Sequence, residues 1–451
     1  MNRLHINSPR LPKSSSFLNR SLWLKIHLWI ALSFGFLLAL LGLTGSVCVY
    51  QTELDHLLNP HLTITKSQAA YQSFDKIMAA LQVAHPQRSG SWTLELPRTE
   101  NDVITAWFDK PRETFFEAYA PLMVAINPYT AEIISSRLWG RTLATWLLKL
   151  HSELLLDGSG STFVGILGIF MCISLGSGVY LWWPGLGKIK QAFQLRTNQG
   201  VMRLCQDAHR WLGLLSSFAL LPLAITGVLL SYPQLSETLF GAAGMEHGQT
   251  GKTIISTADP NDHPTSLSGA VFIARAPFPK ATLRRITTPV GDTGVYQINL
   301  KQGDEINQRH PYTTVWIDRW SGQIKEVRNP QKFSFRQTLN TWIWPLHTGE
   351  MLGSSGRILW FLAGQALFWI YISGLAFWGF RTGKLKDLPI NYSQLRRKLN
   401  DLKRFSYRIV SQTRTKLLDY VRYCIKIMPI IQKFTYRYWR QFEITIRSLK
   451  R

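Results

Sequence analysis

Four histidines stand at the edges of four long apolar segments in this 451-residue chain: His27, His151, His209 and His347. The apolar segments are 26–50, 163–183, 211–232 and 358–380. Each is long enough to cross a bilayer, which requires about 20 apolar residues. An ionisable side chain at the edge of a membrane segment is costly, so each histidine is a candidate functional residue.

The spacing of the histidines follows an internal repeat. A shift of 182 residues carries His27 onto His209, and a shift of 196 residues carries His151 onto His347. Further pairs related by these shifts are Trp29 and Trp211, Phe36 and Phe218, Thr44-Gly45 and Thr226-Gly227, Gly168 and Gly364, Gly178 and Gly374, and Trp182 and Trp378. We therefore interpret the chain as one unit written twice, with the histidines present in both copies.

The repeat predicts how the histidines meet. Copies that start on the same side of a membrane are related by a pseudo-two-fold axis along the membrane normal. His27 would then face His209 at the inner level, and His151 would face His347 at the outer level. Zinc or copper usually requires a third or fourth ligand, and none repeats beside these residues.

Haem, in contrast, requires only two axial ligands, and helix bundles commonly house such cofactors. The chain has no Cys-x-x-Cys-His motif, so attachment through cysteines is not expected. The pattern favours two b-type haems, one held by His27 and His209 and the other by His151 and His347. The alternative for any single histidine is a snorkelling or hydrogen-bonded residue at the membrane edge.

Each of the repeated tryptophans and threonine-glycine pairs near the histidines has two possible structural roles. Trp29 and Trp211 either pack on a porphyrin or anchor the interface, and Thr44-Gly45 with Thr226-Gly227 either line the outer cofactor or pack helices. Candidates for contact with an anionic ligand are Arg284, Arg285 and Arg319. The remaining histidines lack repeat partners and are interpreted as surface residues: His5, His56, His61, His85, His247, His263 and His310.

Charge and composition narrow the class of protein. The formal net charge is +24, hydrophobic residues make up 46% of the chain, and 17 residues are Trp. Basic residues dominate segments 1–25, 184–208 and 381–451, whereas segments 51–148 and 233–345 mix both signs. The positive-inside rule therefore predicts cytoplasmic termini, with the two long segments outside. The charge is explained by the lipid bilayer and not by nucleic acid. The four cysteines form neither a disulfide framework nor a thiolate metal site.

The predicted fold class is a membrane α-helical bundle of four transmembrane helices in two repeated halves, with two α+β lobes. The predicted divisions are a leader (1–25), a helix (26–50), a first lobe (51–148), an interfacial segment with a second helix (149–183), a loop (184–208), a third helix (209–232), a second lobe (233–345), an interfacial segment with a fourth helix (346–380) and a basic amphipathic tail (381–451). The periodicity predicts a helix over 67–84 and a surface helix over 141–156 that ends at Asp157-Gly158. It also predicts a strand-turn-strand in each lobe, over 122–135 and 313–327.

Three features together resemble the PepSY-associated transmembrane family. They are the paired His-x-Trp openings at His27 and His209, the segment Leu150-His151-Ser152-Glu153-Leu154-Leu155-Leu156, and the strand-turn-strand at 124–133 with its second copy at 315–324. The resemblance covers roughly 20–383. The chain departs from the family at two places. Ala131 stands where the family's turn has a Gly, and the second copy has no acidic residues that match Glu153 and Asp157.

This resemblance implies a haem-containing reductase in the bacterial inner membrane, with His27, His151, His209 and His347 as the haem ligands. Its implied partners are a ferric siderophore or other ferric chelate and a cytoplasmic or quinol electron donor, in iron uptake. A second class is a PepSY-type periplasmic binding or regulatory membrane protein without redox activity. A third class, a permease, has little support because no acid pair lies within the spans.

Overall fold

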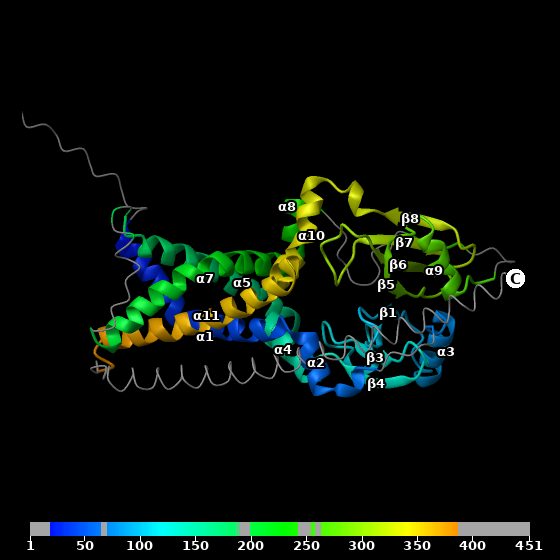
Figure 1. The fold of residues 1–451 in the computed structure, drawn as a ribbon, viewed down its shortest axis with the longest axis horizontal. Coiled ribbons are helices and arrows are strands. Elements are labelled where there is room, and N and C mark those ends of the chain that lie inside the picture. Colours follow the sequence, from blue (N-terminus) through cyan, green and yellow to red (C-terminus); the bar gives the residue numbers. More distant parts are fainter. Residues whose placement is uncertain are drawn as a thin grey trace, which may run out of the picture. The chain divides into compact units, whose positions relative to one another are not determined.

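The computed structural model describes residues 19–64, 70–185, 187, 189, 199–241, 254–257 and 263–386. Within these residues, four helices are long and apolar enough to cross a membrane (Figure 1). They are α1 (Arg20–Cys48), α5 (Asp157–Trp182), α7 (Val201–Ser231) and α11 (Gly353–Arg381), the last preceded by the short helix η5 (Glu350–Leu352). The chain is therefore a multi-pass membrane protein. Most of the leader, residues 186, 188 and 190–198 of the predicted loop, and the predicted amphipathic helix of the tail lie outside the described residues.

The helices α1 and α7 begin before the apolar segments that predict them. Asn19 caps α1, because its Oδ1 accepts a hydrogen bond from the Ser21 amide at 3.0 Å. The basic turn that follows stays helical because long cationic side chains can reach water from the end of a membrane helix. His27 and His209 consequently lie inside their helices and not at the helix ends.

Small residues allow the long helices to cross closely. A Cβ at Gly42 in α1 would lie 2.7 Å from the Gly364 carbonyl oxygen in α11, so the two backbones touch. A Cβ at Gly168 in α5 would lie 2.7 Å from Cγ2 of Val228 and 3.5 Å from the Ala224 carbonyl oxygen, both in α7. Helices in a membrane associate through such small-residue contacts because lipid supplies no hydrophobic drive between them.

The segments assigned to two lobes form one eight-stranded antiparallel sheet (Figure 1). Its strand order is β4-β3-β2-β1-β5-β6-β7-β8. The first four strands are β1 (Thr93–Glu95), β2 (Ile104–Phe108), β3 (Leu122–Ile126) and β4 (Ile133–Leu138), and the last four are β5 (Thr282–Thr287), β6 (Val295–Lys301), β7 (Thr313–Asp318) and β8 (Ile324–Arg328). The two halves join where β1 pairs with β5, with Leu94 opposite Ile286.

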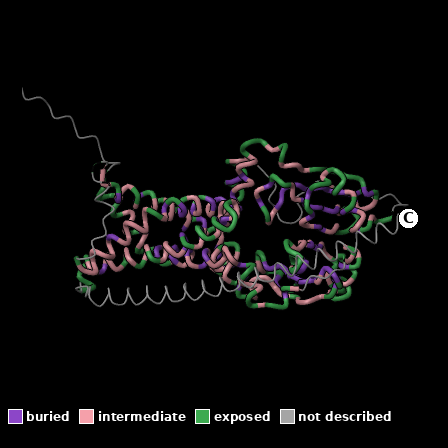
Figure 2. The backbone as a smooth tube through the Cα atoms, viewed as in Figure 1, coloured by how far each residue is buried: buried purple, intermediate pink, exposed green. Residues whose placement is uncertain are grey.

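Two helices, α3 (Phe74–Ala84) and α9 (Leu267–Arg275), cover the sheet and complete its core. One apolar cluster includes Ile77 and Leu81 from α3, Val271 from α9, and inward residues of both halves of the sheet. Figure 2 shows the central strands as largely buried, and every residue of β3 and β7 is buried. The helix α3 starts at Phe74, later than the periodicity predicts, because Ser73 caps it through the Lys76 amide.

The remaining short elements lie in the connections between the strands and the long helices, or between two strands. They are α2 (Gln51–Leu58), η1 (Pro60–Leu62), η2 (Arg112–Thr114), α4 (Leu143–Glu153), α8 (Pro233–Phe240), η4 (Pro330–Lys332) and α10 (Phe335–Thr348). The helices α4 and α10 both carry capping boxes, at Thr142/Thr145 and Ser334/Gln337. They are equivalent in position, because each links an outermost strand of the sheet to a membrane helix.

The Asp157-Gly158 pattern predicts the end of the surface helix. In the structure Asp157 instead begins the second membrane helix, α5. The helix α4 ends at Glu153, and a sharp turn follows in which Leu154, Leu155 and Asp157 have positive φ angles of 50°, 60° and 57°. The Asp157 carboxylate accepts hydrogen bonds from the Ala118 amide at 2.8 and 2.9 Å. This contact with the first half of the sheet holds the turn from which α5 begins.

Candidate cofactor sites in the helix bundle

His27 of α1 lies next to His209 of α7 inside the bundle. Their ring centroids are 6.1 Å apart, and the two ring planes are nearly perpendicular, at 80°. The helices that flank the pair hold each ring through its Nδ1 atom. His27 Nδ1 lies 3.0 Å from the Ser174 carbonyl oxygen in α5, and His209 Nδ1 lies 2.8 Å from the Ile370 carbonyl oxygen in α11.

His151 of α4 and His347 of α10 form a second pair. Their ring centroids are 6.2 Å apart, with an angle of 35° between the planes. His151 Nδ1 lies 3.0 Å from the Leu41 carbonyl oxygen in α1. His347 hydrogen-bonds the Leu223 carbonyl in α7, and its Nδ1 lies 3.0 Å from the Thr226 hydroxyl oxygen in the same helix. The two pairs are therefore held in the same manner, by carbonyl groups of neighbouring helices.

These hydrogen bonds determine which ring nitrogen can act as a ligand. A carbonyl oxygen can only accept a hydrogen bond, so Nδ1 of His27, His151 and His209 carries the proton. The lone pair is then left on Nε2, which is the arrangement that metal-binding histidines adopt. Burial lowers the pKa of His151, and burial together with the nearby His151 lowers that of His347 to about 4, so both rings are neutral near pH 7.

The carbonyl partners repeat with the histidines. The shift of 182 residues that relates His27 to His209 also relates Leu41 to Leu223. The shift of 196 residues that relates His151 to His347 also relates Ser174 to Ile370. The close helix crossings obey the same shifts, because Gly42 corresponds to Ala224 and Gly364 to Gly168. The contacts around the four rings thus follow the same two shifts as the histidines.

Each imidazole packs against a glycine of a neighbouring helix. A Cβ at Gly45 would lie 2.7 Å from Cε1 of His151, and a Cβ at Gly227 would lie 3.2 Å from Cε1 of His347. The corresponding distances are 3.3 Å for Gly178 and His27 and 2.8 Å for Gly374 and His209. The sequence repeat singles out all four glycines, but only the structure shows that each leaves room for a histidine ring.

Two repeat-related threonines lie beside the second pair. Thr44 Oγ1 lies 3.3 Å from His151 Nδ1, and Thr226 Oγ1 lies 3.0 Å from His347 Nδ1. Each hydroxyl also donates to the carbonyl four residues earlier in its own helix, at 2.8 and 2.7 Å. The threonines therefore support the imidazoles by their side chains, while the adjacent glycines provide the space.

The two histidine pairs lie at different depths. Along α1, His27 belongs to the first pair, whereas Leu41 holds a histidine of the second. At 1.5 Å per residue, this separation corresponds to about 21 Å along the helix. Most of the span of the bundle therefore lies between the pairs.

Other predicted site residues lie elsewhere. Trp29 is 68% exposed on the outside of α1, as expected for a lipid-facing or interfacial residue. Arg285 forms an ion pair with Glu95 across the β1–β5 junction, with 3.2 Å between Nη2 and Oε2. The guanidinium carbon of Arg319 lies 4.9 Å from the centroid of the Trp320 ring. Within the described residues, no group of three or more His, Cys, Asp or Glu side chains could hold a metal ion. The histidine pairs thus differ from an ordinary zinc or copper site.

A family model described as the PepSY-associated TM region matches residues 24–381. The chain belongs to this family. The PepSY-associated region begins just before His27 and ends with the last residue of α11, so it includes all four histidines and the whole sheet. The curated proteins include none that matches the chain significantly.

Proposed function

We propose that this PepSY-associated membrane protein is a di-haem b oxidoreductase that reduces the iron of ferric siderophores or other ferric chelates. The proposal is based on the distance between the two imidazole centroids within each histidine pair. This distance is 6.1 Å in the His27–His209 pair and 6.2 Å in the His151–His347 pair. An iron ion bound by two imidazole nitrogens at about 2 Å each would separate two ring centroids by about 6 Å. The residues present therefore fit bis-histidine ligation at both levels.

His27 and His209 would hold one haem, and His151 and His347 the other. When bound, haem supplies a reversible one-electron couple of iron. Hydrogen bonds from Nδ1 to backbone carbonyls orient each ring and make Nε2 a stronger donor to the metal. The glycines keep the rings in place and bring helix backbones close, which limits access of water.

The direction of transfer rests on charge and on the repeat. We infer that the protein lies in the bacterial inner membrane with both termini in the cytoplasm, because basic residues dominate the leader, the 184–208 loop and the tail. The sheet would then lie in the periplasm, and the chain would consist of two repeated halves. One electron from a cytoplasmic donor or a quinol would convert one Fe(III) of the chelate into Fe(II), which such chelates bind less tightly.

An absorbance spectrum tests the proposal. Detergent-purified full-length protein from haem-replete cells is expected to show a Soret band, with α and β bands after dithionite reduction, and about two haems per chain. His151→Ala and His347→Ala are each expected to remove one haem and leave the other. His85→Ala is the matched control, because His85 follows α3 and hydrogen-bonds Ser136 of β4 on the sheet. Unchanged haem content in both ligand variants would contradict the assignment of these residues.

The same preparation separates the proposal from the alternative of a binding or regulatory protein without redox activity. Reduced protein mixed with a ferric chelate is expected to reoxidise and to release Fe(II), which a ferrous-iron indicator measures. A colourless protein would exclude the redox function and favour the binding module.

A further inference from the structure

Three arginines from distant parts of the chain converge beside the junction between the two halves of the sheet. Arg284 of β5 places its Nη1 atom 3.5 Å from the Pro97 carbonyl oxygen and its Nη2 atom 3.5 Å from the Gln308 carbonyl oxygen. The residues that follow these two carbonyls are Arg98 and Arg309. We call Arg98, Arg284 and Arg309 the arginine cluster.

A β-bulge at Arg284 explains how this side chain joins the cluster. In the ladder with β6, Leu283 lies opposite Leu300 and Arg285 lies opposite Asn299, so Arg284 is an extra residue without a partner. Bulges of this kind change the direction of a side chain. The two consecutive arginines can therefore both stay outside the apolar core of the sheet.

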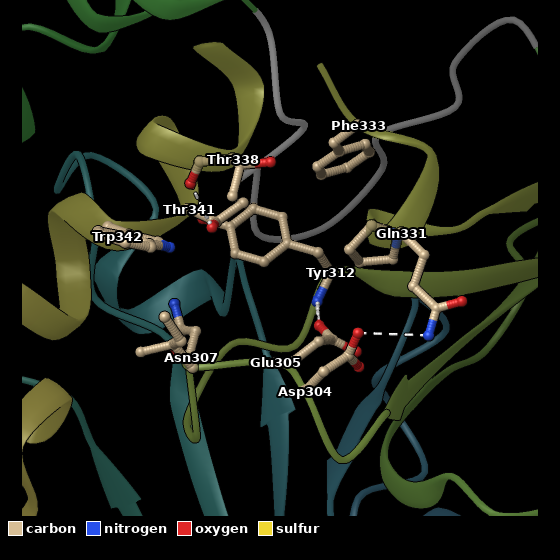
Figure 3. Close-up of a pocket in the computed structure, with 11 residues that line it drawn as sticks. Asp304, Glu305, Asn307, Tyr312, Gln331, Phe333, Thr338, Thr341 and Trp342 are labelled. Carbon is tan, nitrogen blue, oxygen red and sulfur yellow. Dashed lines mark hydrogen bonds between the residues drawn. The ribbon is translucent and has the colours of Figure 1, made fainter. Parts of the chain in front are cut away.

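The connection between β6 and β7 holds the backbone of Arg309 in place (Figure 3). Asn307 Oδ1 accepts hydrogen bonds from the amides of Arg309 at 3.2 Å and His310 at 2.8 Å. The Glu305 carboxylate accepts from the Tyr312 amide at 2.6 Å, as Figure 3 shows. The connection is thus held on both sides of Arg309, and the position of this residue does not depend on a ligand.

The arginine cluster lies near the helix that carries one of the outer histidines. The His310 ring packs edge to face against Trp344 of α10, with ring centroids 4.9 Å apart. The same helix contains His347, one turn beyond Trp344. Since Arg309 precedes His310 in the chain, a ligand held by Arg309 lies beside the helix of the His151–His347 pair.

The arginine cluster carries positive charge that the described residues do not neutralise. Within the described ranges, no carboxylate forms an ion pair with the guanidinium group of Arg98, Arg284 or Arg309. The nearby Glu95 carboxylate already pairs with Arg285 at 3.2 Å. A guanidinium group keeps its charge in proteins and has five N–H donors, so donors remain for an anion.

The surroundings of Arg309 contain charges of both signs. Burial lowers the pKa of its guanidinium group. The nearby Glu95 and Glu350 raise this pKa, whereas Arg98 and Arg285 lower it. In the part of the chain that the structure describes, neither carboxylate approaches Arg309 closely enough for an ion pair. An anion that contacts Arg309 directly would stabilise this half-buried cation among its like-charged neighbours.

We propose that the arginine cluster binds an anionic ferric chelate with free carboxylates, of the citrate type. Arginine pairs with a carboxylate through two parallel hydrogen bonds, so three guanidinium groups match a ligand that presents several carboxylates. The charged oxygens of a trihydroxamate chelate are all bound to iron, which leaves no free carboxylate for the arginines. This substrate class rests on the proposed function, because it concerns the chelate whose iron the protein reduces.

Gallium citrate tests the site without a redox step, because Ga(III) has the charge of Fe(III) and a similar size but is not reduced. The measurement is calorimetric titration of detergent-purified full-length protein. Gallium citrate is expected to bind, and gallium desferrioxamine B, a positively charged trihydroxamate complex, to bind about a hundredfold more weakly. If citrate alone bound as tightly as gallium citrate, the assignment to a chelate would be overturned.

Arg284→Gln and Arg309→Gln test the residues of the cluster. Each is expected to weaken the binding of gallium citrate about tenfold, because a hydrogen bond between two charged groups is lost. Arg275→Gln is the matched control, since it removes the same charge from an exposed position at the end of α9. Unchanged binding in both cluster variants, or equally weakened binding in Arg275→Gln, would contradict the proposal.

Thermal unfolding of the ligand-free variants separates binding from folding. Because Arg309 has no ion pair within the described residues, Arg309→Gln is expected to leave the unfolding temperature unchanged or to raise it. Weaker binding at an unchanged unfolding temperature would show that the side chain acts on the ligand.

Haem propionates are a second source of carboxylates for the cluster. If Arg309 paired with a propionate, Arg309→Gln would lower the haem content and leave gallium citrate binding unchanged, which would overturn the proposal. A colourless protein that binds gallium citrate through the arginines would contradict only the haem proposal. A haem-containing protein that does not bind gallium citrate would contradict only the proposal for the arginine cluster.

Discussion

At the scale of single residues, the bundle depends on glycines as much as on histidines. Each imidazole occupies the space that a side chain at one glycine would fill, and this holds for all four rings. A histidine ring held by one hydrogen bond can still rotate, whereas a ring pressed against a helix backbone cannot. We attribute the fixed position of each ring to this combination of a carbonyl acceptor and a glycine contact.

Gly374→Ala tests the role of these glycines. Its new Cβ would lie 2.8 Å from Nδ1 and Cε1 of His209, so the ring must move and lose its hydrogen bond to Ile370. The expected result is loss of the haem at the His27–His209 level, or a shift of its reduction potential, measured by haem quantification and redox titration.

Gly176→Ala in α5 is the matched control, because no atom lies within 4 Å of the Cβ it would introduce. Both substitutions replace a helical Gly by Ala, so their effects on helix propensity are the same. If the two variants had equal haem content and equal potentials, the glycine contact would have no role in positioning His209.

At the scale of elements, the turn between β3 and β4 and the turn between β7 and β8 show a conflict between residue and backbone. The position of Ala131 in the first turn corresponds to Gly322 in the second. Both are in the left-handed region, with φ of 63° and 70°. Glycine adopts this region freely, whereas a residue with a Cβ pays about 1 kcal/mol or more. The departure from the family's Gly therefore changes the side chain and not the turn.

Reciprocal substitutions measure this strain. Ala131→Gly is expected to stabilise the sheet by about 0.5–1 kcal/mol, and Gly322→Ala to destabilise it by about 1–2 kcal/mol. Thermal unfolding in detergent, followed by tryptophan fluorescence, measures both changes. A stabilising Gly322→Ala would show that the left-handed backbone is not maintained in solution.

At the scale of the whole molecule, the two lobes share one sheet and one core. The β1–β5 ladder is extended by Thr288, whose amide donates to the Trp92 carbonyl at 2.9 Å and whose hydroxyl accepts from the Trp92 amide at 2.9 Å. Side chains of α3 and α9, from different lobes, belong to the same apolar cluster. Two halves that share a core are expected to unfold together.

Ile104→Ala tests this coupling. Ile104 in β2 is fully buried, and its truncation is expected to cost about 2–5 kcal/mol. If the sheet is one cooperative unit, amide hydrogen exchange will accelerate in β6 and β7 of the other half as well as in β2 and β3. Ile324→Ala, at an exposed position in the edge strand β8, is the control and is expected to alter exchange only locally. Unchanged protection in β6 and β7 after Ile104→Ala would mean that the lobes unfold independently.

Apolar length and the 182- and 196-residue shifts are sufficient to predict four membrane helices and the two histidine pairs, because a bilayer fixes helix length and a repeat fixes which residues correspond. The helix starts were not predictable, because the basic turns before His27 and His209 are polar yet remain helical. Nor was the function of Asp157, because its partner, the Ala118 amide, is distant in the chain.

The sequence by itself therefore determined the class of protein, the paired histidines and the composition of each lobe, since these depend on local pattern and on internal comparison. Only the tertiary structure decided that each imidazole hydrogen-bonds a carbonyl, that a glycine accommodates each ring, and that the lobes merge through β1 and β5. It alone brought the three residues of the arginine cluster together. Each of these features joins segments that are far apart in the chain, and their contacts arise from packing, on which local sequence carries no information.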